Sequence, residues 1–528
     1  MSARLSYTEE RIRSATSTDV VLGSLLERHA AQRPGEVFAT FEDGTAWTRA
    51  QCLDAARSAA DVLRRSGVRP GDRVGLLMGN GPGFLRAWWG TALLGAVTFP
   101  VNTAFRGEPL TRALRLARPR VVVADPGLVE RLPDSAVPHL DPDELLGGDP
   151  VAPGGRTELW DDQFLLLTSG TTGPSKLVRV SHLYPYVAYS SILAGQRFGP
   201  DDVFLVDLPL FHMAALGYLY SCLVTGSRVH VRSRPALDRY WEVLGAHDIT
   251  GCVLISSMVP MLMSQPARPA EREHRMRFML AAPVPGDVEG FKRRFRIPTL
   301  LTSWGSTEMS AAVIGEAVPG VASGFCGTVR PGYEVRVVDE HDQDVPTGAV
   351  GEGVVRASRP FVMSSGYFAD DAATGRAWRH GWFHSGDLLR ADEHGSLHFV
   401  ERAGDAIRRR GENVSAFEVE QAVLGFPGVA EAAAVAVPSD TGVDHEIKVW
   451  VVPGGGAGPD WAKLLEHCLE ELPHFMVPRY FQAAPELPKS PTAKIQKYLL
   501  RERGNSTDTW DSVAHGLVVT RRGLERTR

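Results

Sequence analysis

The chain has 528 residues and a mass of 57.5 kDa, which is enough to bury several hydrophobic cores, so we expect two or more domains. Its hydrophobic fraction of 44% and charged fraction of 23% are ordinary for a globular protein. The formal net charge of −5 argues against a nucleic-acid-binding body, which would need a basic surface.

Short apolar segments alternate with helical segments from about residue 20 to residue 310, which favours a layered α/β architecture with largely parallel sheets. Ligand sites in such sheets lie at the carboxyl ends of the strands. The predicted strands are 72–78, 97–102, 120–124, 203–208, 228–231, 252–256, 277–281 and 299–302, and predicted helices include 83–89, 109–116 and 287–294.

The most informative segment is a loop that follows the apolar run 164–167 and precedes a second apolar segment, 177–180. Its residues are Thr168, Ser169, Gly170, Thr171, Thr172, Gly173, Pro174, Ser175 and Lys176. Glycines and hydroxyls let such a loop point N–H and O–H groups at a polyphosphate, although the spacing is not the Walker pattern. Only seven of the 57 basic residues are lysines, so a compact ammonium at Lys176 supports a phosphate loop over a flexible surface loop.

The predicted strand 299–302 is followed by Ser303, Trp304, Gly305, Ser306, Thr307 and Glu308. The indole can stack on a flat base, and the Thr307 hydroxyl and Glu308 carboxylate can hold phosphate and a hard cation such as Mg²⁺. A buried tryptophan followed by a helix-capping threonine is the alternative interpretation.

Short strands broken by proline and glycine over about 324–356 predict a small β-barrel-like subdomain. Further along, Asp387 follows a glycine turn and can accept both hydroxyls of a ribose, or simply cap the turn. Arg402 is suited to a second nucleotide contact, whereas the pair Gly366 and Tyr367 has no chemistry that composition assigns.

We place a domain boundary near residue 402, which gives domains 1–401 and 402–528. The second domain is predicted to contain helices at 416–424 and 461–472 and strands at 432–437 and 447–452, and the last twenty or so residues to be poorly ordered. Within it, a proline-rich segment from Leu487 ends in Lys494, and a rigid loop that presents one ammonium suits stabilisation of developing negative charge. A solvated surface lysine is the alternative.

The five cysteines, Cys52, Cys222, Cys252, Cys326 and Cys468, are scattered and form no C-x-x-C pair, so we interpret them as reduced core thiols. The first thirteen residues have no apolar stretch and the longest apolar run, 87–101, is too short and interrupted to cross a bilayer. We expect a cytoplasmic monomer or homodimer without a membrane span.

Taken in this order, the segments resemble the adenylate-forming superfamily of acyl-CoA synthetases, adenylation domains and beetle luciferases, over about residues 21–500. The resemblance implies a large N-terminal domain and a small mobile C-terminal domain, with ATP and Mg²⁺ bound between them. It further implies that a carboxylic acid is converted to an acyl-adenylate, which then reacts with the thiol of coenzyme A.

The resemblance also implies residue roles. The loop from Thr168 to Lys176 closes over the β- and γ-phosphates, Trp304 replaces an adenine-stacking tyrosine, Thr307 contacts phosphate and Glu308 holds Mg²⁺. Asp387 binds the ribose with help from Arg402, Lys494 bridges ATP and the carboxylate, and His212 matches the gate of the acyl pocket. Gly411 belongs to the cofactor-binding set. It lies in a segment with Arg408, Arg409 and Arg410 that corresponds to the thiol tunnel. These arginines either contact the phosphates of CoA or form a solvated basic edge.

Two departures concern the mobile domain: Gly404 occupies the hinge position and Ala493 replaces the glycine before the lysine. The acyl-pocket candidates are apolar and aromatic, which favours an aromatic or medium-size apolar acid, although 408–415 resembles ligases for carnitine-like acids and so points to a more polar one. These candidates are His212, Met213, Tyr218, Met258, Ala281, Ala282, Pro283, Trp304 and Met309.

Two other functions stay open. A stand-alone adenylating enzyme would load an acyl or aryl group onto the phosphopantetheine of a carrier protein. A non-catalytic nucleotide-binding homologue is the alternative of another class, which the retention of Lys176, Glu308, Asp387 and Lys494 argues against.

Overall fold

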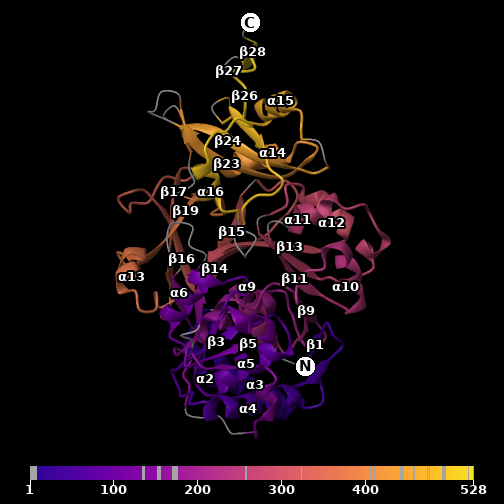
Figure 1. The fold of residues 1–528 in the computed structure, drawn as a ribbon, viewed down its shortest axis with the longest axis vertical. Coiled ribbons are helices and arrows are strands. Elements are labelled where there is room, and N and C mark those ends of the chain that lie inside the picture. Colours follow the sequence, from indigo (N-terminus) through magenta and orange to yellow (C-terminus); the bar gives the residue numbers. More distant parts are fainter. Residues whose placement is uncertain are drawn as a thin grey trace.

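The structure is a computed structural model in which a larger N-terminal part carries a smaller C-terminal part at one end (Figure 1). It describes residues 9–133, 137–150, 156–168, 176–255, 258–282, 284–322, 324–402, 407–409, 412–414, 416–439, 445–455, 458–472, 474, 476–489, 495–520 and 523–526.

The first parallel sheet arises from apolar runs that are buried on both faces. Its strand order is β6-β5-β3-β4-β7-β8, and all neighbours are parallel except the last pair. The bounds are β3 Arg73–Leu77, β4 Val97–Pro100, β5 Val121–Ala124, β6 His139–Leu140, β7 Asp162–Leu167 and β8 Leu177–Ser181. Figure 1 shows α3, α4 and α5 grouped around β3 and β5. The N-terminal helices are α1 Glu9–Ser14, α2 Ser17–Val20, α3 Leu22–Gln32, α4 Arg49–Arg65, α5 Pro82–Leu93 and α6 Gly107–Ala117.

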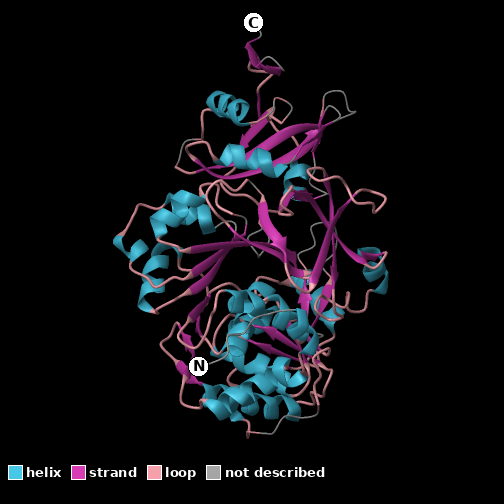
Figure 2. Ribbon diagram, turned by 180° about the vertical axis from the view of Figure 1, so that it is seen from behind, coloured by secondary structure: helices cyan, strands magenta, loops and turns pink. Residues whose placement is uncertain are grey.

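A larger sheet has a parallel half with the order β13-β12-β11-β9-β10-β1, edged by antiparallel β2. The bounds are β1 Val37–Phe41, β2 Ala46–Thr48, β9 Val203–Val206, β10 Arg228–Val231, β11 Gly251–Ile255, β12 Phe278–Ala282 and β13 Thr299–Ser306. The accompanying helices are α7 Leu183–Ala188, α8 Ser190–Gly195, α9 Met213–Thr225, α10 Tyr240–Ala246, α11 Met258–Ser264 and α12 Val288–Phe295. The predicted α/β class with parallel sheets is therefore confirmed, and Figure 2 shows the strands lying between helices.

The same sheet continues through antiparallel strands in the order β14-β15-β20-β19-β17-β16. Their bounds are β14 Ser310–Glu316, β15 Phe325–Val329, β16 Tyr333–Val338, β17 Val350–Ala357, β19 Trp382–Ala391 and β20 Leu397–Arg402, with α13 Asp371–Ala377 and β18 Trp378–Arg379 beside them. Within the described residues this order is open, with β16 at one end and β2 at the other. The short strands predicted for 324–356 are present, but the barrel is not confirmed.

The C-terminal part is built on a four-stranded sheet, β23-β24-β25-β26, with its own buried apolar clusters. Its elements are β21 Ile407–Arg409, β22 Glu412–Val414, α14 Ala416–Leu424, β23 Val429–Pro438, β24 His445–Pro453, α15 Trp461–Glu471, β25 Tyr480–Ala483, α16 Lys497–Arg503 and β26 Trp510–Asp511. The large and small domains are thus as expected, and the exact boundary near 402 stays a prediction.

The end of the chain differs from the expectation of poor order. Leu517–Thr520 (β27) and Gly523–Arg526 (β28) form an antiparallel hairpin, and Leu517 is buried against the C-terminal core. The β-branched pair Val518 and Val519 favours a strand, which explains the error.

All five cysteines are buried and free, as predicted. Among the described residues, the helices are all too short or too polar to cross a lipid bilayer.

Candidate active site

Four neighbouring parallel strands, β9, β11, β12 and β13, bring their carboxyl ends to one edge of the large sheet. His212 precedes α9 beyond β9, Met258 begins α11 beyond β11, and Ala282 ends β12. Trp304 lies in β13 itself. These candidates therefore lie at the edge where ligands bind in such sheets, and their roles in binding stay predictions.

The loop that ends in Lys176 connects β7 to antiparallel β8, as predicted for a loop between two strands. Its base is closed because Thr168 N–H donates to the Lys176 carbonyl at 2.9 Å and Lys176 N–H donates to Thr168 Oγ1 at 3.2 Å. Ser169, Gly170, Thr171, Thr172 and Gly173 lie outside the described residues. The two ends of the predicted phosphate loop are thus fixed side by side.

A chain of contacts joins Lys176 to Glu308. The Lys176 ammonium lies 4.9 Å from the centre of the Tyr367 ring, and the Tyr367 hydroxyl donates to Glu308 Oε1 at 2.9 Å. The other oxygen of Glu308 accepts the Ser306 hydroxyl at 2.8 Å. Burial and the neighbouring Glu308 raise the pKa of the Tyr367 phenol, so this hydroxyl is a neutral donor at ordinary pH. Composition alone had assigned Tyr367 no role.

The turn between β13 and β14 carries Thr307 and Glu308, and Gly305 lies near the end of β13 just before it. A Cβ on Gly305 would lie 1.9 Å from the Ser310 carbonyl oxygen, so only glycine permits this tight return of the chain. The buried Tyr184 hydroxyl donates to the Thr307 carbonyl at 3.0 Å and holds the turn from below. Ser303 pairs with Ile314 further down the same hairpin.

Trp304, in the middle of this hairpin, contacts Asp387 directly. The indole N–H donates to Asp387 Oδ2 at 2.9 Å, and Arg402 Nε lies 3.1 Å from Asp387 Oδ1. Asp387 and Arg402 are also register partners in β19 and β20. Asp387 and Arg402 are therefore in direct contact, their joint role toward a ribose stays a prediction, and Trp304, only 5% exposed, turns its polar edge to Asp387.

Glu352 in β17 fixes the part of β19 that carries Asp387. Its Oε1 accepts the Gly386 N–H at 2.9 Å, and its Oε2 lies 2.9 Å from Nδ1 of the buried His384. The Asp387 N–H in turn donates to Ser385 Oγ at 3.0 Å. Sequence reasoning missed Glu352; its only signal was a carboxylate within an apolar strand.

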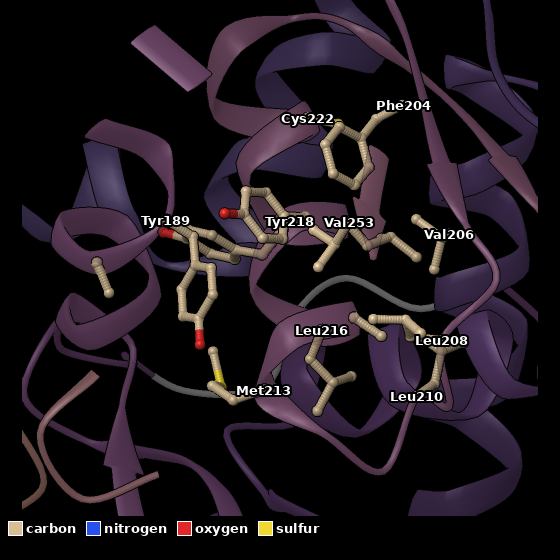
Figure 3. Packing of buried hydrophobic residues seen from close by; sticks show 14 of the residues in the cluster. Tyr189, Phe204, Val206, Leu208, Leu210, Met213, Leu216, Tyr218, Cys222 and Val253 are labelled. Atoms are coloured by element: carbon tan, nitrogen blue, oxygen red, sulfur yellow. The ribbon is translucent and has the colours of Figure 1, made fainter. Parts of the chain in front are cut away.

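The remaining acyl-pocket candidates are apolar and buried. Tyr218 stacks on Phe204 with ring centres 4.8 Å apart and meets Tyr189 edge to face at 5.2 Å. Figure 3 shows Met213, Tyr189 and Tyr218 close together, with Phe204 beside Tyr218. Met213, Met258, Ala281 and Met309 are each at most 5% exposed, and Pro283 lies outside the described residues.

Asp207, at the end of β9, is a buried carboxyl that sequence reasoning did not single out. Its Oδ2 has no hydrogen-bond partner within the described residues. Burial raises the pKa of Asp207 to about 7, against the opposing effect of a backbone hydrogen bond and of Arg232. Because side chains alternate along a strand, Asp207 continues the sheet face of Leu205. This face is opposite the one on which Phe204 contacts Tyr218.

Lys494, Gly404 and Gly411 lie outside the described residues. The flanks of the Lys494 segment are joined by an antiparallel bridge between Lys489 and Ile495, and Lys489 pairs with Glu431 at 2.6 Å. Of the three arginines near the predicted thiol tunnel, Arg409 is 5% exposed and pairs with Glu446 at 2.7 Å. Arg409 is therefore structural rather than a contact for CoA phosphates.

Glu308 suits a cation that is shared with phosphate. Each of its oxygens accepts one hydroxyl and retains a second lone pair. Across the described ranges, His, Cys, Asp and Glu side chains form no group of three able to enclose a metal. Mg²⁺ is usually held by one or two carboxylates together with substrate phosphates and water, so the single carboxylate fits that ion.

Two family models cover the chain. "AMP-binding enzyme" matches residues 26–368, and "AMP-binding enzyme C-terminal domain" matches residues 418–494. The chain belongs to the AMP-binding enzymes. The sequence resemblance to adenylate-forming enzymes is thereby confirmed.

Curated relatives of this family member are CoA ligases. The crotonobetaine/carnitine–CoA ligase of Citrobacter koseri is 30% identical over 478 residues, which cover 84% of the chain and 90% of the relative. That of Salmonella arizonae is 27% identical over 523 residues and covers 90% and 99%.

Solved structures share the fold along nearly the whole chain. ATP-bound MatB from Rhodopseudomonas palustris has a TM-score of 0.80 and 25% identity, covering 91% of this chain and 98% of its own. The anthranilate–CoA ligase AuaEII with anthranoyl-AMP has a TM-score of 0.83 and 21% identity, covering 92% and 97%. O-succinylbenzoate CoA synthetase from Bacillus subtilis, with ATP and magnesium ion, has a TM-score of 0.81 and 22% identity, covering 90% and 98%.

Proposed function

We propose that this AMP-binding enzyme activates an aromatic or medium-size apolar carboxylic acid and transfers it to coenzyme A. The chain is an AMP-forming acid–CoA ligase. One observation carries the assignment of the site: a single hairpin, β13–β14, presents Glu308 toward Lys176 and Trp304 toward Asp387. The hairpin thereby carries the carboxylate for the metal and, through Trp304, contacts the carboxylate in β19 that is proposed for the ribose.

In the first half-reaction, an oxygen of the acid attacks the α-phosphorus of ATP, the bond to the β-phosphate oxygen breaks, and pyrophosphate leaves. Asp387 and Arg402 orient the ribose, while Thr168 to Lys176 and Thr307 surround the phosphates. Glu308 would hold Mg²⁺, which when bound would supply positive charge at the phosphate oxygens. Lys494 places its ammonium between the two anions, which offsets their repulsion as they approach.

In the second half-reaction, the thiol of CoA attacks the carbonyl carbon of the acyl-adenylate, and AMP leaves as the thioester forms. The C-terminal domain, 402–528, turns about residues near 402 so that Lys494 leaves and the thiol reaches the carbonyl. Glycine at position 404 tolerates a large change in backbone angles. His212 gates the acyl pocket next to the reacting carboxylate.

The choice of acid follows from the charges around the pocket candidates. Tyr189 and Tyr218 lie close enough to the buried Arg330 guanidinium to interact with its charge. Arg330 donates to neutral oxygens, including the Val187 carbonyl at 3.2 Å, and no carboxylate of the described residues forms an ion pair with it. A quaternary ammonium, as carnitine and crotonobetaine carry, would meet this positive charge. An apolar acid avoids that repulsion, although the relatives named for carnitine make the cationic acid the second candidate.

Acid-dependent ATP–pyrophosphate exchange tests the proposal. The panel contains aryl acids, aliphatic acids of four to eight carbons, carnitine, crotonobetaine and a dicarboxylic acid. We expect exchange with aryl or aliphatic acids, and thioester formation with free CoA but no need for a carrier protein. Exchange with carnitine alone would overturn the apolar acid, and exchange without turnover on CoA would favour a carrier-protein thiol.

A further inference from the structure

Tyr367 is held directly beside the strand that leaves the Lys176 loop. Arg179 N–H donates to the Gly366 carbonyl at 3.0 Å, and Phe368 N–H donates to the Leu177 carbonyl at 2.7 Å. These bonds flank an antiparallel bridge between Val178 and Tyr367. The backbone of Tyr367 is therefore fixed relative to β8 and to Lys176.

Gly366 makes this placement feasible. Its φ is +112°, and a Cβ there would lie 2.7 Å from Thr374 Cγ2, so a larger residue would be strained and crowded. Thr374 Oγ1 accepts the Tyr367 N–H at 2.9 Å. The conformation of Gly366 and the hydrogen bond of the Tyr367 N–H thus fix the direction of the Tyr367 side chain.

The Tyr367 side chain makes one contact with its ring face and another with its hydroxyl. Its ring face lies 4.9 Å from the Lys176 ammonium, a distance at which a cation is attracted to an aromatic face. Its hydroxyl donates to Glu308 Oε1 at 2.9 Å. Tyr367 is 6% exposed, and a low-polarity surrounding strengthens both interactions.

We propose that Tyr367 is a positioning residue for the phosphate end of the site, on the basis of the proposed function above. Its ring holds the Lys176 ammonium and its hydroxyl orients the Glu308 carboxylate. Each group thus has its own contact with Tyr367, and no Lys176–Glu308 ion pair is present within the described residues. The cation stays available to phosphate and the carboxylate to Mg²⁺.

A purely packing role is the alternative, because the Tyr367 ring also meets Trp378 edge to face at 5.7 Å. Phenylalanine would satisfy packing equally well. Tyr367→Phe removes only the hydroxyl, whereas Tyr367→Leu removes the ring face as well. Tyr240→Phe is the matched control, since Tyr240 is a buried tyrosine on α10 without a contact to Glu308 or Lys176.

Equilibrium binding of ATP, measured with Mg²⁺ and with EDTA, separates the two contacts. For Tyr367→Phe we expect about a tenfold loss of affinity with Mg²⁺, because a hydrogen bond to a charged group is lost, and less than about a twofold change with EDTA. Tyr367→Leu should lose affinity under both conditions, and Tyr240→Phe under neither. Thermal unfolding confirms that each variant is folded.

The scarcity of lysine provides a second readout. A protease that cuts only after lysine has seven sites in the chain, and a cut after Lys176 gives fragments 1–176 and 177–528. Tyr367→Leu should be cut there several-fold faster than the wild type, because the ammonium loses its aromatic support, whereas Tyr367→Phe should be cut at the wild-type rate.

Wild-type affinity of Tyr367→Phe with Mg²⁺, or an equal loss with EDTA, would overturn the role of the hydroxyl. Unchanged cutting of Tyr367→Leu at Lys176 would overturn the role of the ring. Neither ATP binding nor proteolysis at Lys176 requires turnover. A wild-type enzyme without acid-dependent pyrophosphate exchange would therefore contradict the proposed function, whereas the role of Tyr367 would still be decided by the binding and proteolysis results.

Discussion

The Trp304 indole N–H donates to the Asp387 carboxylate at 2.9 Å and so joins strands β13 and β19 through two residues that are 83 positions apart in the sequence. The carboxylate also faces Arg402 at 3.1 Å. Two donors of different kinds therefore fix the orientation of Asp387 before any ribose arrives, which reduces the ordering that nucleotide binding requires.

Removal of the indole N–H should weaken nucleotide binding more than it weakens the fold. For Trp304→Phe we expect the KM for ATP to rise about tenfold with a smaller change in kcat, because a hydrogen bond to a charged group is lost. Steady-state kinetics with varied ATP measures this. The control is Trp241→Phe, since Trp241 is equally buried and its indole N–H has no partner among the described residues; a similar rise in both variants would contradict the role of Trp304.

Glu352 should also help to position the Asp387 carboxylate, because it holds the backbone of the neighbouring Gly386. Glu352→Ala loses the acceptor for Gly386 N–H and the partner of His384, so we expect the KM for ATP to rise about fivefold to tenfold. Glu352→Gln keeps one acceptor oxygen and should lie between this variant and the wild type. Glu334 in neighbouring β16 pairs with Arg356 in an exposed bridge, so Glu334→Ala should change KM little. Equal KM values for ATP in Glu352→Ala and Glu334→Ala would contradict the role of Glu352 in positioning Asp387.

Much of this site was predictable because its residue types form short local motifs. The β10 strand, 228–231, and the α14 helix, 416–424, follow from local apolar patterns and were predicted with the correct bounds. The β13 strand runs to Ser306, beyond the predicted end at 302, because it pairs with β14 in a hairpin. That pairing, and the contacts of Trp304 with Asp387 and of Tyr367 with Glu308, depend on strands distant in sequence, which periodicity does not report.

Asp207 should make stability depend on pH. Its pKa is raised to about 7 in the folded chain from an ordinary value near 3.8, so the folded state binds the proton more tightly than the unfolded state. Stability from this group is complete below about pH 4 and is lost as the pH rises through 7, by on the order of 4 kcal/mol.

Asp207→Asn should remove that dependence. Urea unfolding between pH 4.5 and 8 measures the free energy, and the difference between wild type and variant should shift in favour of the variant as the pH rises. Asp201→Asn, at an exposed position before the same strand, is the control. Parallel curves for wild type and Asp207→Asn would show that Asp207 does not titrate in this range.

Lys494 should serve the first half-reaction alone. For Lys494→Ala we expect adenylation to slow by about 100-fold or more, since a charge that stabilises the transition state is lost, while attack of CoA on preformed acyl-adenylate is largely retained. Rapid-quench measurement of the two half-reactions separates them. Lys489→Ala is the matched control because Lys489 is engaged with Glu431; equal losses in both half-reactions of Lys494→Ala would argue against its assigned role.

The central claim, that the chain makes an acyl-adenylate and then a CoA thioester, is tested most directly by a single-turnover experiment with α-labelled ATP and the preferred acid. Without CoA, the label should appear in an acyl-AMP as pyrophosphate is released in equal amount, and added CoA should convert that acyl-AMP to thioester and free AMP. Labelled ADP with inorganic phosphate, or no acid-dependent product at all, would contradict the account.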